Sequence, residues 1–438
     1  MSIYGHSLAH PPHGRKRFLL NSLSFLRTPR APSLSRNEAP NFHISAKTPD
    51  IPSILCFNPG VDSVTDLLQQ LVRIPSVNPD GDPGTDQCGE EKLARWLGAF
   101  LDAEGFTVTM EEVKPGRPNL IARSPGPHSD NRPRILLGPH LDTVGIGGMT
   151  IDPFGGGISG GKLWGRGASD TKGPMAAMIW GLLRNRERLA DLPVAVDFVA
   201  FMSEESDQFG SKHFARKHAG NYEFAIAGEP TELELVHTTK GSLWAVIEAT
   251  GVSGHSSQPE SGENAIMKMV DALTSLEGKL KGLLSEFTHP VLGPATLNVG
   301  IISGGTRANI IPDRATAQID IRYPPSLSEK CPATELLEGF IARNDLPVSL
   351  SVSADNPPME VDSDHPWLRR ILAVHPHSKL VGAPWFSDAA HLNDGGLPSI
   401  CLGPGSISQA HTRDEFIKIT DLEAGADYFT ELVAGLQA

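Results

Sequence analysis

The chain has 438 residues, of which 39% are hydrophobic and 20% charged, and this length is enough for two or three domains with a large core. Residues 1–50 hold seven basic and two acidic residues, so the other 388 carry a net charge of −18 within the total of −13. A body this acidic argues against a nucleic-acid partner, and no apolar run reaches the roughly 18 to 20 residues of a membrane span.

Residues 1–58 are excluded from the predicted fold. This segment is rich in Arg, Ser and Pro and poor in acidic residues, which is typical of an organellar transit peptide or of a disordered extension. Four scattered cysteines, Cys56, Cys88, Cys331 and Cys401, form no C-x-x-C pair and are expected to be reduced thiols. The expected location is therefore the cytoplasm, or a mitochondrion or plastid if the extension is a transit peptide.

Two amphipathic helices are predicted first, over residues 61–74 and 90–105. Four apolar strands of the buried type follow along the chain. They are RILLGPHLD, VAVDFVAFMSEE, YEFAIAGEP and LPSICLGPG, in residues 134–142, 194–205, 222–230 and 397–405. Strands of this kind that alternate with helices, such as the one predicted over 173–189, indicate an α/β fold with a mostly parallel sheet between helices. Ligands of such sheets bind beyond the carboxyl ends of the strands.

The pattern changes between residues 242 and 357, where the predicted elements follow the order β-α-β-β-α-β. We expect a compact ferredoxin-like α+β unit here, inserted into a larger domain made of residues 59–241 and 358–438. In the strand ATAQIDIRY, alternation places Asp320 and Arg322 on the polar face.

Residues that can bind metal ions gather after the predicted strands. They are His140, Asp142, Asp170, Glu204, Glu205, Glu229 and, later, His411. Imidazoles with carboxylates suit zinc, cobalt or manganese, and a set without thiolates is unlike a structural zinc site. Buried carboxylates need cations, and five ligands would satisfy two ions if one carboxylate bridges them. The five are His140, Asp170, Glu205, Glu229 and His411.

Two further carboxylates are expected to act on this site. Asp142 lies two residues beyond His140 and could accept the second imidazole N–H, which would select the tautomer of the ring. Glu204 could take the proton from the attacking water and pass it to the leaving group. His237 and His391 lack acidic neighbours of this pattern and are expected to be structural.

A near-match to a phosphate-binding loop lies in IDPFGGGISGGKLWG, residues 151–165, where Gly156 precedes Gly161 and Lys162. A true phosphate loop needs a buried strand before it and Ser or Thr after the lysine. Leu163 follows the lysine, and ISGGKLWG indicates a β-hairpin with glycines at its turn. A nucleotide-dependent enzyme is therefore a weaker alternative. A non-catalytic binding protein is the other weaker alternative, because it predicts the loss of a ligand or of the base and all of them are present.

The motifs HLDTV, GRGASDTKG, SEES, AGEPT and GPGSISQAHTRDEF resemble, in order and spacing, those of the dinuclear zinc aminoacylase and carboxypeptidase family, peptidase family M20. The resemblance extends from about residue 61 to the C-terminus. It implies a site for two zinc ions, which cobalt or manganese could replace. By similarity, Glu204 is the general base and acid, and Asp170 bridges the ions. The remaining ligands are His140 and Glu229 on one ion and Glu205 and His411 on the other.

The inserted unit resembles the lid of this family, which also forms homodimers. By similarity, His255 reaches the active site of the partner subunit and stabilises the oxyanion. Asn309 and Arg322 resemble positions that hold the substrate carboxylate, for which Arg is a natural partner; from the residues alone, the arginine could instead pair with a surface acid. Gly405 and Ser406, in the turn GPGS, could present backbone N–H groups to the same carboxylate.

The resemblance implies hydrolysis of the amide bond in a small-molecule N-acyl amino acid. The motif GPGSISQAHTRDEF is most similar to that of the acetylornithine deacetylases, which release acetate. The succinyl-diaminopimelate desuccinylases are the first alternative within the family, and its dipeptidases and carboxypeptidases are the next.

Overall fold

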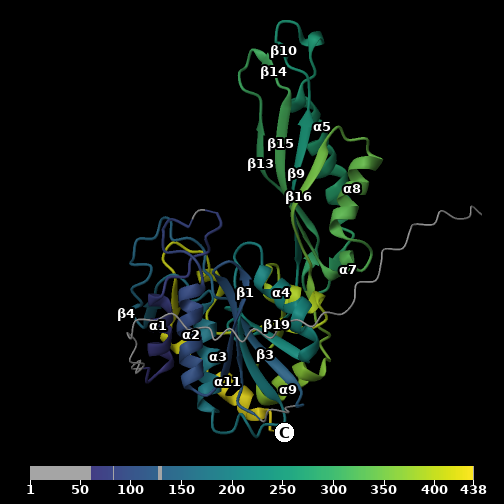
Figure 1. Cartoon of the computed structure of the whole chain (residues 1–438). Helices are drawn as coiled ribbons and strands as arrows, with labels where there is room; N and C mark the ends of the chain where they lie inside the picture. Colours follow the sequence, from purple (N-terminus) through teal and green to yellow (C-terminus); the bar gives the residue numbers. More distant parts are fainter. Residues whose placement is uncertain (1–60, 82, 127–130, 438) are drawn as a thin grey trace, which may run out of the picture. The chain divides into compact units, whose positions relative to one another are not determined.

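The computed structural model describes residues 61–81, 83–126 and 131–437 (Figure 1). The predicted extension, residues 1–58, lies outside them. Two large sheets, of nine and of four strands, organise the described chain, and each has its own hydrophobic core. Within these residues, no helix combines the length and the apolar character that a membrane crossing requires.

The nine-stranded sheet is mixed, with a parallel centre. Its order is β1-β2-β6-β3-β7-β19-β8-β17, and β18 pairs with β8. The central strands β6, β3, β7 and β19 are parallel to one another, whereas β1, β2, β8 and β17 join antiparallel neighbours. Its strands are β1 (Thr107–Lys114), β2 (Arg117–Arg123), β3 (Arg134–Pro139), β6 (Ala195–Ala200), β7 (Phe224–Gly228), β8 (Leu235–Thr239), β17 (Met359–Glu360), β18 (Leu380–Ala383) and β19 (Ser399–Cys401). The expected α/β fold is confirmed, and its parallel part is the centre of the sheet.

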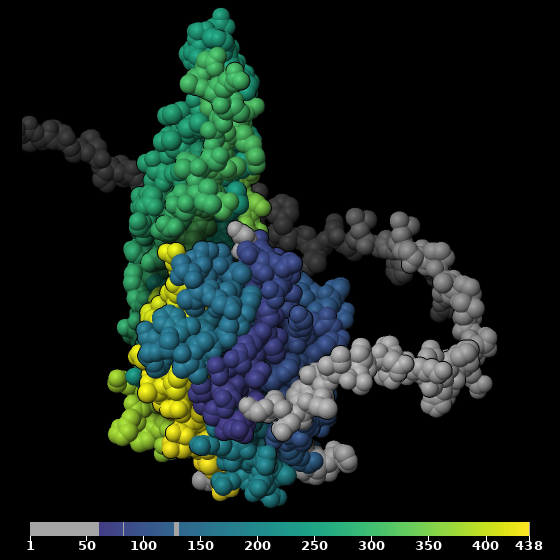
Figure 2. All heavy atoms as spheres, turned by 90° about the vertical axis from the view of Figure 1, so that its left-hand side faces the viewer, coloured from purple at the N-terminus to yellow at the C-terminus, as the bar shows by residue number. Residues whose placement is uncertain are grey.

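Helices cover both faces of this sheet, which explains why its central strands are mostly apolar and almost entirely buried. In β3, Ile135 and Leu137 join one core and Leu136 joins the other, because successive side chains of a strand point to opposite faces. The first core also takes residues of α1 (Val64–Arg73), α2 (Glu91–Ala103), α3 (Lys172–Arg184), α9 (Pro366–Val374) and α11 (Ile419–Gly435). The second takes residues of α4 (Phe209–His218) and α10 (Asp388–Asp394). Figure 2 shows the purple segment of α1 beside the yellow C-terminal segment, as the contacts of α1 with α11 require.

The predicted helix over residues 173–189 is shorter than expected and ends at Arg184. The next residue explains this end, because the Asn185 side chain donates to the Gly181 carbonyl at 2.8 Å and to the Thr430 carbonyl at 3.0 Å. A side-chain amide thus satisfies a carbonyl that a further helical turn would have used. The helices predicted over residues 61–74 and 90–105 correspond to α1 and α2.

The four-stranded sheet has the order β13-β15-β9-β16, with every pair antiparallel. Its elements are β9 (Gly241–Thr250), α5 (Ala265–Ser275), β13 (Thr296–Gly304), β15 (Arg314–Tyr323), α8 (Ala333–Arg343) and β16 (Ser349–Asn356). This is the predicted β-α-β-β-α-β order in a ferredoxin-like arrangement. In β15 every second residue is buried, so Asp320 and Arg322 lie on the less buried face, as expected. The domain boundaries themselves stay a prediction.

Short elements complete the described chain. The glycine-rich segment forms the predicted hairpin of β4 (Gly157–Ser159) and β5 (Lys162–Trp164), which β20 (Phe416–Lys418) extends. Gly160 and Gly161 occupy its turn with φ of 58° and 71°, a left-handed conformation that favours glycine. The other short strands and α-helices are β10 (Gly254–His255), α6 (Lys281–Leu284), β11 (Thr288–His289), β12 (Gly293–Pro294), β14 (Ile310–Ile311) and α7 (Pro325–Ser328). Four further short helical elements are η1 (Ala219–Asn221), η2 (Pro259–Ser261), η3 (Leu276–Leu280) and η4 (Ile407–Gln409).

Candidate metal centre

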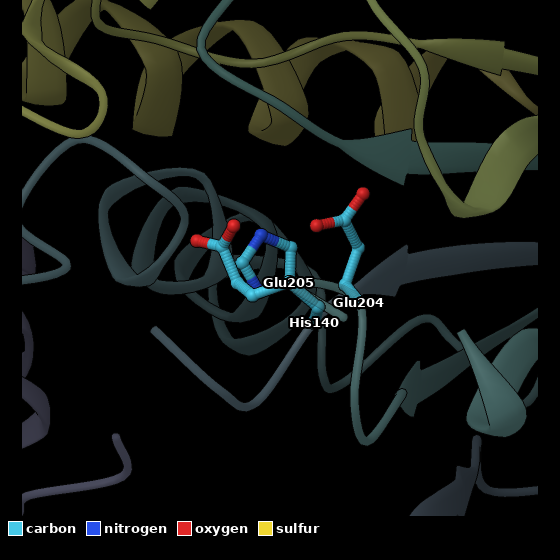
Figure 3. Close-up of side chains that lie close together, drawn as sticks. All are labelled: His140, Glu204 and Glu205. Carbon is cyan, nitrogen blue, oxygen red and sulfur yellow. The ribbon is translucent and has the colours of Figure 1, made fainter. Parts of the chain in front are cut away.

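Three parallel strands bring five of the predicted residues to one edge of the large sheet. β3 ends just before His140 and Asp142, β6 leads to Glu204 and Glu205, and β7 ends just before Glu229. Because β6, β3 and β7 are adjacent and parallel, their carboxyl ends meet at the same edge. In Figure 3 the carboxylates of Glu204 and Glu205 lie on either side of the His140 ring.

Two loops add the remaining predicted ligands. Asp170 lies just before α3, and its Oδ1 is 3.1 Å from Nε2 of His140. His411 lies in the segment before β20, where its Nε2 is 3.0 Å from Oε2 of Glu205 and 3.5 Å from Oδ2 of Asp170. The two oxygens of Asp170 thus face two different histidines, which is the placement that a bridging carboxylate requires.

Three sets of residues could each hold a metal ion. Within each set, every residue offers one nitrogen or oxygen atom, and these atoms lie within 4.8 Å of one another. The sets are His140–Asp170–Glu229, Asp170–Glu205–His411 and His140–Glu204–Glu205. The first two share Asp170 and together contain all five residues predicted as ligands. In addition, Oε1 of Glu205 is buried and has no hydrogen-bond partner among the described residues. The residues therefore fit a pair of divalent ions held by imidazole and carboxylate groups.

The electrostatics of the cluster also favour cations. Burial raises the pKa of Glu204 and Glu229 well above the ordinary value, and nearby carboxylates add to the rise in each case. Gathering several ionised carboxylates in a buried place is unfavourable unless positive charge compensates them. Divalent ions bound between these groups would supply that charge and hold the carboxylates ionised.

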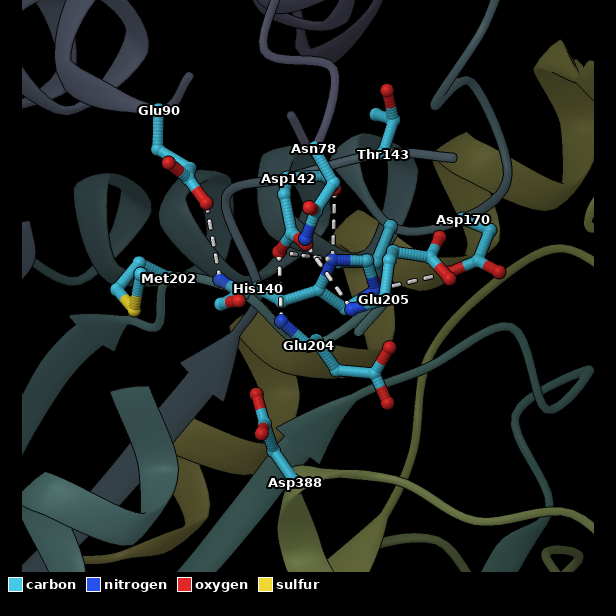
Figure 4. Close-up of polar contacts among 12 residues, drawn as sticks. Asn78, Glu90, His140, Asp142, Thr143, Asp170, Met202, Glu204, Glu205 and Asp388 are labelled. Carbon is cyan, nitrogen blue, oxygen red and sulfur yellow. Dashed lines mark hydrogen bonds and ion pairs between the residues drawn. The ribbon is translucent and has the colours of Figure 1, made fainter. Parts of the chain in front are cut away.

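Asp142 makes a wider set of contacts than the sequence predicts (Figure 4). Nδ1 of His140 lies 2.9 Å from the main-chain oxygen of Asp142 and 3.6 Å from its carboxylate. The carboxylate itself accepts hydrogen bonds from the backbone N–H groups of Glu204 and Glu205, at 3.0 and 3.1 Å. It also accepts one from Nδ2 of Asn78 at 2.7 Å. Asp142 therefore supports both the histidine and the loop that carries the two glutamates.

A buried ion pair that the sequence analysis did not identify holds the same loop. Nη2 of Arg117 lies 2.6 Å from Oε1 of Glu90, and that oxygen also accepts from the backbone N–H of Ser203 at 3.1 Å. Ser203 has φ of 67°, which is unfavourable for a residue with a side chain. A single glutamate before an amphipathic helix carries no sequence signal for this role, because its partners come from distant segments.

Asp388 is a second residue that the sequence analysis did not identify. It is the first residue of α10 and is buried on the side of Glu204, as Figure 4 shows. Ser211 donates a hydrogen bond to its Oδ1, whereas its Oδ2 has no partner among the described residues. Burial raises the pKa of Asp388 to about 7.

His255 lies in β10 and Asn309 directly precedes β14, and these two strands lie at one end of the inserted unit (Figure 1). Strands β10 and β14 pair there, and the backbone N–H of Ser256 donates to the carbonyl of Asn309 at 3.2 Å. Both residues are exposed. The ring of His255 contacts Ser257, with Nδ1 and Oγ 2.7 Å apart. Among the described residues, no hydrogen bond or ion pair joins either of them to the metal cluster.

Arg322 has a partner within its own strand. Its Nε lies 3.0 and 3.1 Å from the carboxylate oxygens of Asp320, and its guanidinium lies 5.9 Å from the ring centre of Trp244. The surface ion pair that the residues alone left open is therefore formed. A role in binding a substrate carboxylate would require Arg322 to exchange this partner.

Gly405 and Ser406 form the predicted turn beside the ligand loops. Gly405 has φ of 86°, and Ser406 accepts a hydrogen bond from Oγ of Ser169 at 3.3 Å. Its own hydroxyl donates to Glu232 at 2.7 Å. Both residues line a cavity of about 500 Å³ together with Glu232 and Lys418.

The two histidines expected to be structural belong to none of the three metal sets. His237 is buried, and its Nδ1 lies 2.8 Å from the carbonyl of Val361. His391 is also buried, and burial lowers its pKa to about 3, which corresponds to a neutral imidazole.

Comparison with known proteins gives a consistent result. Residues 136–435 match the model of "Peptidase family M20/M25/M40". The chain is 34% identical over 383 residues to an acetylornithine deacetylase of Proteus mirabilis (strain HI4320), covering 84% of this chain and 95% of that protein. The structure is similar to that of aminopeptidase PepT from Bacillus cereus ATCC 10987, with a TM-score of 0.69 and 19% identity over 86% of this chain and 98% of that one. It is also similar to the YXEP protein of Bacillus subtilis, described as a dinuclear metal-binding peptidase from the M20 family, with a TM-score of 0.58 and 17% identity over 85% and 97% of the two chains.

Proposed function

Because the chain belongs to the peptidase family M20/M25/M40 and is a metal-dependent hydrolase, we propose that its substrate is an N-acyl amino acid and, specifically, N-acetylornithine. The reaction would release acetate and ornithine, a step of arginine biosynthesis. The identity of 34% to an acetylornithine deacetylase, over nearly the whole of that protein, supports this substrate. The two solved structures are less than 20% identical to this chain, so they support the fold and not the choice of substrate.

We assign two metal ions to the cluster, and zinc as the native metal. Asp170 would bridge them, with His140 and Glu229 on one ion and Glu205 and His411 on the other. The geometry supports this assignment, because these five residues make up two sets that share only Asp170. When bound, such ions would polarise the acyl carbonyl and lower the pKa of a water molecule.

Glu204 is the residue that we assign to proton transfer. One observation carries this assignment: its carboxylate lies beside His140, while the adjacent Glu205 already reaches His411. An ionised carboxylate at this place can act as a general base toward water. Glu204 would accept the proton of the attacking water and then donate it to the departing amine.

The inserted unit would contribute substrate contacts in a homodimer. Its strand β13 is an edge of the four-stranded sheet, and Ile301 and Ile302 on it are 54% and 57% exposed. On α5, Met267 and Val270 are 55% and 42% exposed. An apolar edge strand with exposed apolar neighbours favours pairing with another chain. A dimer through this surface would let His255 stabilise the oxyanion in the partner's site and let Asn309 and Arg322 bind the substrate carboxylate.

A comparison of substrates tests the proposal. The purified, zinc-loaded protein is assayed on N-acetylornithine, N-succinyl-diaminopimelate and simple dipeptides. We expect the highest kcat/KM on N-acetylornithine; a higher value on either other substrate would replace the proposed substrate. A chelator should abolish turnover, and zinc, cobalt or manganese should restore it. Activity that survived complete metal removal would contradict the metal assignment.

A further inference from the structure

Glu415 is a buried carboxylate that the proposed chemistry does not use. It is 1% exposed and follows His411 by four residues. Its Oε1 accepts hydrogen bonds from the backbone N–H groups of Ser169 and Asp170, at 2.8 and 2.9 Å. Its Oε2 accepts one from the backbone N–H of Gly167 at 2.9 Å. Both oxygens are therefore used to hold the main chain around the proposed bridging ligand.

Arg166 completes this arrangement and connects it to two further segments. It is 3% exposed, and its Nη1 lies 2.9 Å from Oε2 of Glu415. Its Nη2 donates to the carbonyl of Thr412 at 3.2 Å, and its Nε donates to the carbonyl of Gly145 at 3.1 Å. The guanidinium thus joins the loop after β3, the loop before α3 and the segment that contains His411.

The segment around His411 needs such support. His411 has φ of 57°, a backbone conformation that costs free energy in a residue with a side chain. The neighbouring Asp414 accepts the backbone N–H of Thr150 at 2.8 Å, so the segment is held on two sides. Burying Glu415 and Arg166 would be unfavourable unless each formed several charge-assisted hydrogen bonds, and the two residues form them with these loops.

We propose that Glu415 is a positioning residue. Together with Arg166 it fixes the position of Asp170 relative to His411, and this position determines the affinity for the ion that Asp170 and His411 share. The other ion would depend less on Glu415, because His140 and Glu229 directly follow strands β3 and β7 of the sheet. This inference rests on the proposed ligand set. It assigns to Glu415 no contact with substrate.

Replacement of Glu415 by Gln tests the proposal. A glutamine amide can accept hydrogen bonds on only one side and presents N–H donors on the other, so it would face backbone N–H donors with donors of its own. The full chain is stripped of metal with a chelator and titrated with Co²⁺, with calorimetry and visible absorption as readouts. We expect two equivalents in the unaltered protein. In Glu415→Gln, the ion shared by Asp170 and His411 should bind roughly 10- to 100-fold more weakly, the usual effect of removing a partner of a metal ligand, and the affinity for the other ion should fall less.

Glu111→Gln is the matched control. Glu111 lies on β1, is 10% exposed at its side chain and is surrounded by Lys217, His213 and His218. Among the described residues, none of its hydrogen bonds or ion pairs reaches a ligand loop. We expect Glu111→Gln to bind two equivalents of Co²⁺ with unchanged affinity. Equal loss of metal in both variants, or two unchanged sites in Glu415→Gln, would overturn the proposal.

A milder variant covers the case in which Glu415→Gln does not fold. Glu415→Asp keeps the charge but is one methylene shorter, so it cannot reach all four donors at once. We expect a selective loss of the same ion, smaller in size, together with a lower kcat and a KM within about threefold of the original, since kcat and not substrate binding depends on the ligand loop. Two unchanged sites in a folded Glu415→Asp would also overturn the proposal.

Asp170→Asn separates this proposal from the one on which it rests. If Asp170→Asn binds both ions as before, the proposed ligand set is wrong. If Asp170→Asn loses metal while Glu415→Gln does not, the ligand set stands and only the positioning role of Glu415 fails.

Discussion

The edge of the large sheet and the end of the inserted unit differ in how completely one chain organises them. At the sheet edge, His140, Asp142 and Asp170 are buried and bonded to other parts of the same chain. At the end of the inserted unit, His255 and Asn309 are exposed and contact mainly residues in and around the strand pair β10–β14. The first region contains all five proposed metal ligands, whereas the second makes no hydrogen bond or ion pair to them among the described residues.

This difference suggests a division of labour. Parallel strands and buried ion pairs hold the proposed metal ligands rigidly, as a site that must bind two ions requires. An exposed strand pair can instead move or meet another copy of the chain, which suits residues that contact the substrate after it binds. The following predictions test this division, beginning with the residue expected to have the largest effect.

Glu204 should be required for turnover but not for metal binding. Glu204→Ala removes the proposed proton acceptor and should lower kcat by roughly 10²- to 10⁴-fold, with the metal content unchanged. Glu205→Ala, at the adjacent position, should instead lose the ion shared with His411. Steady-state kinetics and metal analysis of both variants check this contrast. Turnover at the original rate in Glu204→Ala would exclude the proposed mechanism.

His255 should act on a different copy of the chain. His255→Ala removes one donor to the oxyanion and should lower kcat by roughly 10²- to 10³-fold. Mixing His255→Ala with Glu204→Ala after dissociation should restore activity, because a mixed dimer contains one site with Glu204 from one chain and His255 from the other.

The outcome of this mixing experiment decides between the two arrangements. If His255 served the site of its own chain, no mixed dimer would contain a complete site and activity would not return. A fully active monomer in sedimentation would likewise contradict a role of His255 in the partner's site.

The sequence predicts the sheet edge well for a physical reason. A buried parallel strand is a continuous apolar run, and a polar residue directly after it must lie at the carboxyl edge. His140, Glu205 and Glu229 are placed correctly by this reasoning alone. Strand β8 was not predicted, because Thr238, Thr239 and other polar residues interrupt its apolar run.

The support of the site could not be predicted in the same way. Glu415 binds backbone N–H groups that lie more than 240 residues earlier in the chain, and Glu90 binds the N–H of Ser203. A carboxylate that accepts from the main chain needs no particular side chain at its partner, so no local pattern marks it. The sequence also could not show whether Arg322 binds a substrate or Asp320, because each of them offers a carboxylate to the guanidinium.

Arg322 tests how far the inserted unit contributes to substrate binding. If Arg322 exchanges Asp320 for the substrate carboxylate, Arg322→Ala should raise KM for N-acetylornithine by roughly 10- to 100-fold, the usual value of a charged hydrogen bond, and change kcat less. Arg314→Ala is the matched control, because Arg314 lies on the same strand and pairs with Glu248 at 2.7 Å. Equal KM values in the two variants would remove Arg322 from the substrate site.

The smallest expected effect compares one carboxylate of the large sheet, Glu111 on β1, with one of the four-stranded sheet, Glu248 on β9, through the pH dependence of stability. Hydrogen bonds from Lys217 and His218 oppose the effect of burial and lower the pKa of Glu111 to about 2, from an ordinary value of 4.5. A carboxyl group whose pKa is lower in the folded state stabilises the protein above its unfolded pKa, and this stabilisation is lost as the pH falls through the folded value. Glu111→Gln should therefore lower the Tm at pH 7, and the difference from the original protein should shrink between about pH 4.5 and pH 2. Glu248 of the four-stranded sheet has a side chain that is 32% exposed, and it pairs with Arg314, which is 66% exposed. A hydrogen bond from Arg314 lowers the pKa of Glu248. Because salt screens pairs at the surface, Glu248→Gln should change the Tm less, and not at all at high ionic strength. Equal, salt-sensitive changes in both variants would show that the two sheets do not differ in how firmly they hold these two carboxylates.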